Sequence, residues 1–94
     1  ERDEALLEIA GAGALRNDAY DLHHMGHGEA GIEVLQIAAE IFPREARVYD
    51  ALGDLWAYGG HRDQAIAAYG KALELDPTLE ATRKALAELQ TTAR

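Results

Sequence analysis

The organisation of the chain is clearest in residues 46–79, which read ARVYDALGDLWAYGGHRDQAIAAYGKALELDPTL. In the first half of this stretch, apolar or small residues recur at the i, i+3, i+4 and i+7 spacing of an amphipathic helix: Tyr49, Leu52, Gly53 and Trp56. Two glycines then end this helix, because glycine accepts the backbone conformation that follows a helix terminus. The second half predicts another helix, which ends before Pro77 and has an apolar side made of Ala65, Ile66, Tyr69, Ala72, Leu73 and Leu75.

The same pattern occurs a second time upstream, at a period of 34 residues. Residues 12–45 can be laid over 46–79, and the identical pairs are Ala12/Ala46, Gly26/Gly60, His27/His61, Ile32/Ile66, Ala38/Ala72, Glu40/Glu74 and Pro43/Pro77. A fixed period in this range is the signature of stacked helical repeats. The sequence therefore predicts an all-α fold of antiparallel helix pairs.

Residues 46–79 resemble a tetratricopeptide repeat. The resemblance rests on Tyr49-x2-Leu52-Gly53-x2-Trp56, Gly60, Ala65-Ile66, Tyr69, Ala72-Leu73 and Leu75-Asp76-Pro77. The upstream copy departs from the family at Asp18, where a large apolar residue is usual, and at Gly31, where alanine is usual. Residues 80–91 look like the solvating helix that closes such arrays. The resemblance implies a right-handed α-solenoid.

The predicted organisation has four parts. Residues 1–11 form an N-terminal helix or linker, and a break at Gly11-x-Gly13 separates them from the first repeat. The first repeat is 12–45, the second is 46–79, and 80–94 are the closing helix and tail. Two repeats fall short of the three that a stable stack usually needs. We therefore expect an apolar end to be covered by residues 1–11, by a domain of the parent chain, or by a second copy in a homo-oligomer. The first residue is Glu1 and not methionine, so we also expect the chain to be a piece of a longer protein.

Composition argues against several function classes. The 94 residues include 17 acidic and 9 basic side chains, and the net charge of -8 argues against a nucleic-acid partner and an anionic membrane surface. The chain contains no cysteine and no serine, which excludes thiolate metal sites and the two commonest nucleophiles. No pattern places a pair of carboxylates in an apolar pocket for acid–base chemistry. We predict no catalytic residue, no enzyme activity and no cofactor, and favour the cytoplasm as location.

Four histidines are the candidate metal ligands: His23, His24, His27 and His61. A spacing of four residues can place two imidazoles on one helix face, but a glycine lies between His23 and His27. Ordinary turn histidines are the preferred interpretation, and we predict no metal site. A histidine-based metal-binding module remains an alternative.

The resemblance implies a groove on the concave side, lined by the first helix of each pair. The positions that it maps are Gly13, Arg16, Asn17, Tyr20, His23, His24, Arg47, Asp50, Ala51, Asp54, Ala57 and Tyr58, with Ala81, Lys84, Ala85 and Glu88 of the closing helix. From these we predict a partner-binding groove of Arg16, Asn17, Tyr20, His24, Arg47, Asp50, Asp54 and Tyr58. In chaperone adaptors with this fold, lysine, asparagine and arginine side chains on the inner helices hold the C-terminal carboxylate of a partner. Among the matching positions here, only Arg16 keeps a side chain of this kind. The predicted function is a non-catalytic protein–protein interaction module that binds a protein or peptide or mediates self-association.

A second resemblance gives an alternative function. The segments Asn17-x2-Tyr20-x-Leu22, Phe42-Pro43 and Tyr49-Asp50-x-Leu52-Gly53-Asp54 are similar to a repeat pair that follows bacterial serine hydrolases of the β-lactamase-like and α/β-hydrolase esterase types. This resemblance implies a C-terminal accessory domain that packs on the hydrolase or mediates self-association.

Overall fold

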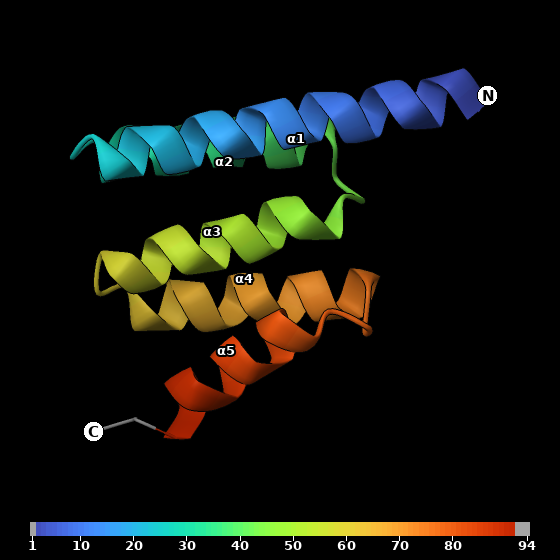
Figure 1. Cartoon of the computed structure of the whole chain (residues 1–94). Helices are drawn as coiled ribbons and strands as arrows, with labels where there is room; N and C mark the ends of the chain where they lie inside the picture. Colours follow the sequence, from blue (N-terminus) through green and yellow to red (C-terminus); the bar gives the residue numbers. More distant parts are fainter. Residues whose placement is uncertain (1, 92–94) are drawn as a thin grey trace.

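A computed structural model describes residues 2–91, with side chains from residue 6, and this range contains five helices and no strand (Figure 1). The helices are α1 (Arg2–His24), α2 (Gly28–Ile41), α3 (Ala46–Tyr58), α4 (Arg62–Leu75) and α5 (Glu80–Thr91). α1 pairs with α2 and α3 with α4, while α3 also packs on α2 and α1, and α5 packs on α4. The all-α stack of helix pairs is therefore confirmed. Within the described range, no helix combines the length and apolar character needed to cross a bilayer.

The turns within the two helix pairs have the same construction. Gly26 and Gly60 adopt φ values of +89° and +83°, a region that favours glycine. In each turn the N–H of the following histidine reaches back to a carbonyl oxygen of the preceding helix: His27 to Leu22 and His61 to Trp56, both at 2.8 Å. This is the Schellman arrangement, which satisfies carbonyl groups at the helix end. The Gly-His identity of the two copies is thus explained by turn geometry.

Small residues allow the helices to approach closely in the core. Besides the large side chains Leu35 and Val48, the residues with no exposed surface are alanines at several helix contacts: Ala19, Ala38, Ala51, Ala65 and Ala72. A Cβ on Gly31 would lie 2.7 Å from the carbonyl oxygen of Ala19, which is backbone and cannot turn aside. The departure of the first copy from alanine at this position therefore follows from the closeness of α1 and α2.

The predicted break at Gly11-x-Gly13 is wrong. α1 runs without interruption from Arg2 to His24. A glycine inside a helix costs only about 0.5–1 kcal/mol relative to alanine, and Gly11 has a packing role, because a Cβ there would lie 2.9 Å from Cζ of Phe42. Residues 6–10 are exposed, so this part of α1 extends the first helix pair without covering its end.

Candidate functional site

The predicted groove residues lie on α1 and α3. Four of them, Arg16, Tyr20, Arg47 and Asp50, line one hollow of about 390 Å³. Its other wall is made by the turn before α5 and the first residues of that helix: Thr78, Leu79, Glu80, Ala81 and Thr82. A second hollow of about 480 Å³ shares both arginines and is also lined by Ile9, Ala12, Gly13, Glu45 and Val48. The surface of these two hollows is called the groove below.

Three helices are joined beside the groove by one carboxylate, that of Asp54. The Tyr20 hydroxyl of α1 donates to Oδ2 of Asp54 at 2.5 Å, and the Tyr69 hydroxyl of α4 donates to Oδ1 at 2.5 Å. Burial, and then the hydrogen bond to the carboxylate, raises the pKa of both phenols. The hydrogen bonds of Tyr20 and Tyr69 to Asp54 therefore hold α1, α3 and α4 in register.

A second hydrogen bond ties α5 to the groove. Thr82 is 2% exposed, and its Oγ1 donates to Oδ1 of Asp50 at 2.6 Å. Burial is the largest cause that raises the pKa of Asp50, while the bond from Thr82 acts in the opposite direction. The position of the α5 start against α3 is thereby fixed by a partly buried hydrogen bond.

Tyr69 and Thr82 are absent from the predicted site. Tyr69 reads in the sequence as a core residue, since its spacing places it on the apolar side of its helix. Thr82 precedes Leu86 and Leu89 at i+4 and i+7, a spacing that puts all three on the inner side of α5. That spacing is the signal that could have identified Thr82 as buried, although its partner Asp50 is distant in sequence.

The two arginines of the groove carry its free positive charge. Among the described residues, the ion pairs are Lys71 with Glu74 at 4.0 Å and Arg83 with Glu80 at 2.8 Å. Neither Arg16 nor Arg47 takes part in these ion pairs. Both lower the pKa of Asp50 through a longer-range electrostatic interaction. Their guanidinium groups are thus available to a bound molecule.

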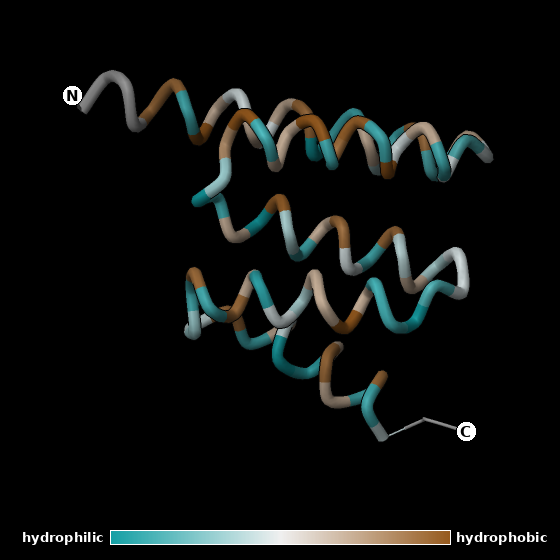
Figure 2. Tube along the Cα trace, turned by 180° about the vertical axis from the view of Figure 1, so that it is seen from behind, coloured by the Kyte–Doolittle hydropathy of each residue, from teal (hydrophilic) through white to brown (hydrophobic). Residues whose placement is uncertain are grey.

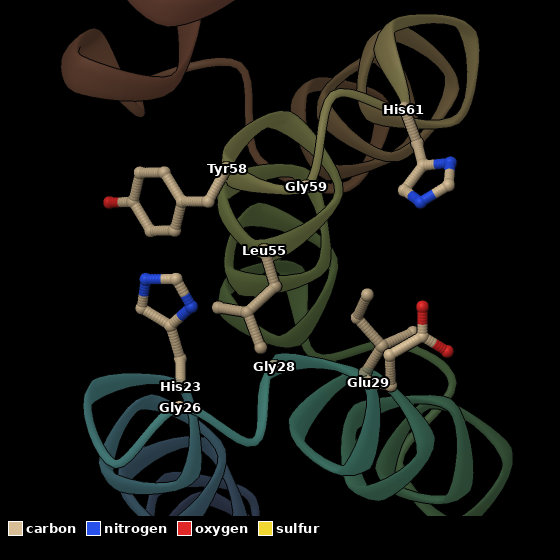
Figure 3. Close-up of a pocket in the computed structure, with 9 residues that line it drawn as sticks. His23, Gly26, Gly28, Glu29, Leu55, Tyr58, Gly59 and His61 are labelled. Atoms are coloured by element: carbon tan, nitrogen blue, oxygen red, sulfur yellow. The ribbon is translucent and has the colours of Figure 1, made fainter.

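Tyr58 lies at the turn end of α3, one helical turn beyond Asp54 on the same face. Its side chain is 59% exposed and stacks on the ring of His23, with centroids 4.7 Å apart (Figure 3). The two rings line a separate hollow of about 290 Å³, together with Gly26, Gly28, Glu29, Ile32, Leu55, Gly59 and His61. The predicted residue Tyr58 is therefore next to the groove and outside its two hollows.

Two residues of the predicted site and one further mapped position lie apart from the groove. Asn17 and His24 are exposed on α1 and are not among the residues that line its hollows. Ala51, which the family pattern assigned to the groove, has no exposed surface and belongs to the core. This assignment is wrong, because Ala51 lies on the side of α3 that packs against neighbouring helices.

The histidines do not gather into a metal centre. Within the part of the chain that the structure describes, no three histidine, cysteine, aspartate or glutamate side chains are grouped as metal ligands would be. Figure 3 shows His23 turned toward Tyr58, whereas His61 lies on the other side of Leu55, the side of Glu29. The ring of His61 also meets that of Trp56 edge-on, with centroids 5.2 Å apart. The described contacts of His23 and His61 are therefore contacts with aromatic rings.

Helix pairs stacked in this way, with a groove beside the first helix of each pair, define a helical-repeat protein. Residues 46–79 match the family model of the tetratricopeptide repeat. The chain is also 31% identical, over 71 residues, to small glutamine-rich tetratricopeptide repeat-containing protein 2 of Mycosarcoma maydis. Residues 46–79 are therefore a tetratricopeptide repeat, and the chain is related to a protein that contains such repeats. The alignment covers 76% of this chain and 20% of that relative, so the chain spans about one fifth of the relative's length.

Alkaline pH is expected to weaken the fold through the Asp54 network. The pKa of Tyr20 and Tyr69 is raised above the ordinary value of 10.0. At a pH slightly above 10, both phenols therefore stay protonated in the folded state, whereas the same phenols in the unfolded state ionise. Their contribution is fully present below about pH 10 and is lost as the pH rises further. Urea denaturation should show the free energy of unfolding falling as the pH is raised above about 10. The fall should be smaller in a Tyr20→Phe/Tyr69→Phe variant, and equal slopes would contradict this explanation.

Proposed function

We propose that the chain is a non-catalytic protein–protein interaction module whose groove binds a segment of a partner protein. The observation that carries this proposal is the hollow of about 390 Å³ between α1, α3 and the start of α5. Its walls are bonded to each other through Tyr20–Asp54 and Thr82–Asp50. A groove that is already ordered loses little conformational entropy on binding, which favours affinity.

Arg16 and Arg47 supply the chemistry of recognition. A guanidinium group presents several N–H donors in one plane and forms strong hydrogen bonds to carboxylate and carbonyl oxygens. The chain as a whole has a charge of -8, which repels strongly acidic partners at long range. We therefore expect a segment that is neutral or basic overall and places a single acceptor group between the two arginines.

Tyr58 extends the contact surface toward the turn end. Its exposed ring offers apolar area with a hydroxyl at the tip, a combination that is enriched at interfaces. The ring is held in place by its stacking on His23. In this proposal the bound segment runs along α1 and α3 from the two arginines toward Tyr58.

A selection from a random peptide display library against the 94-residue chain tests the proposal. The affinity of the selected peptides should fall by about tenfold or more in an Arg16→Ala/Arg47→Ala variant, since each hydrogen bond to a charged group contributes about 1.5–3 kcal/mol. The matched control is Arg44→Ala/Lys71→Ala, which removes the same charge from outside the two hollows and should change affinity less than about twofold.

Two results would overturn the groove as the binding site. One is an equal loss of affinity in the groove variant and in its charge-matched control, which would indicate long-range attraction only. The other is a folded chain that selects no peptide from the library.

A further inference from the structure

The two ends of the helix stack differ in the side chains that they expose. α5 closes the C-terminal end, and its leucines Leu86 and Leu89 are half-buried. At the N-terminal end, Leu7 of α1 is 71% exposed, and Ile37 and Ile41 of α2 are 54% and 55% exposed. Large apolar side chains are thus open to solvent at the N-terminal end of the stack.

These three residues share the side of the first helix pair that faces away from α3. Ile37 lies about 200° around α2 from Leu35, which has no exposed surface and belongs to the core. Ile41 follows one turn after Ile37 on the same face. In Figure 2, no helix of the stack lies beyond α1 and α2 on the side away from α3.

Leu7 continues this face on α1. The ring of Phe42, at the end of α2, lies against Gly11, so the last turn of α2 is beside that part of α1. Leu7 is one turn before Gly11 and therefore lies on the same side of the helix. We call Leu7, Ile37 and Ile41 the end stripe.

From residue 6 onward, the exposed charged side chains of α1 and α2, the helices that carry the end stripe, are acidic. Glu33 and Glu40 of α2 and Asp18 and Asp21 of α1 are exposed. α2 contains no lysine or arginine, and from residue 6 onward α1 contains only Arg16, which lines the groove. An apolar stripe with carboxylates along its borders is complementary to an apolar stripe bordered by cations.

The stack indicates which kind of element such a face accepts. α3 packs on α1 and α2, and α5 packs on α4, so the element that covers a helix pair here is a helix. No helix of a second copy has the required charge, because α4 and α5 are neutral and the other helices are acidic. We propose that the end stripe binds a cationic amphipathic helix, independently of the groove.

The test uses a synthetic leucine–lysine peptide of about 14 residues, patterned so that leucines and lysines occupy opposite faces of a helix. Binding is measured by fluorescence anisotropy of the labelled peptide with the 94-residue chain. An Ile37→Gln/Ile41→Gln variant should bind at least about tenfold more weakly. Both residues are more than half exposed, so circular dichroism should show an unchanged fold. A Glu33→Gln/Glu40→Gln variant should lose several-fold in affinity and much of the salt dependence.

Controls separate this surface from the groove and from general stickiness. Met25→Gln removes another exposed apolar side chain away from the stripe, and Arg16→Ala/Arg47→Ala alters the groove; both should bind the peptide as the parent chain does. A leucine–glutamate peptide of the same pattern should not bind. Equal affinity of the parent and the Ile37→Gln/Ile41→Gln variant would overturn the proposal. So would sedimentation showing a dimer that this variant abolishes, because the stripe would then belong to a second copy.

Discussion

Replacing Asp54 with alanine is expected to lower the free energy of unfolding by about 2–4 kcal/mol. The carboxylate accepts the hydroxyls of Tyr20 and Tyr69, each at 2.5 Å, and both tyrosines are at least partly buried. Without it, two donors in the protein lose their partner, and each such loss costs about 1–3 kcal/mol. Urea denaturation followed by circular dichroism measures the change.

A variant that removes the donors together with the acceptor provides the control. Tyr20→Phe/Tyr69→Phe/Asp54→Leu leaves no unpaired polar group, so it should recover a large part of the stability that Asp54→Ala loses. If Asp54→Ala changes the free energy of unfolding by less than about 0.5 kcal/mol, the network does not hold α1, α3 and α4 together.

Replacing Gly53 with alanine is expected to destabilise the fold by about 1–3 kcal/mol. A Cβ at this position would overlap the ring atoms Cδ1 and Cε1 of Tyr69, so the ring or the helix would have to move. The ring cannot simply turn away, because its hydroxyl is bonded to Asp54. The same denaturation experiment reports the loss as a lower midpoint.

Gly70 provides a matched control in the partner helix. It lies inside α4, and a Cβ there would meet nothing within 4 Å. Gly70→Ala should therefore stabilise the chain by about 0.5–1 kcal/mol, through helix propensity alone. Changes of the same sign in the two variants would contradict the account of packing between α3 and α4.

The fold could be predicted because its signals are local or periodic. The 34-residue spacing is the periodic signal. The turn glycines Gly26 and Gly60 and the helix-ending prolines are local signals, because each acts within a few residues of its own position. The break at Gly11 was a wrong prediction, because the role of that glycine depends on Phe42, which reaches it from the end of α2. A sequence pattern alone does not distinguish a glycine that ends a helix from one that admits a neighbouring ring.

The site could be predicted in outline only. The family pattern selected Arg16, Tyr20, Arg47 and Asp50, which do line one hollow. It did not predict that Tyr20 is bonded to Asp54, because that pair is 34 residues apart. Thr82 was missed for the same reason, since its partner Asp50 lies 32 residues away in the chain.

The most direct test of the groove is the mapping of a selected display peptide on the chain by NMR. Titration of the isotope-labelled chain with the tightest peptide should shift the backbone amide signals of α1, α3 and the start of α5, with the largest changes around Arg16, Arg47 and Asp50. Shifts confined to α2 and α4, the second helices of the two pairs, would contradict the proposal that the groove is the binding site.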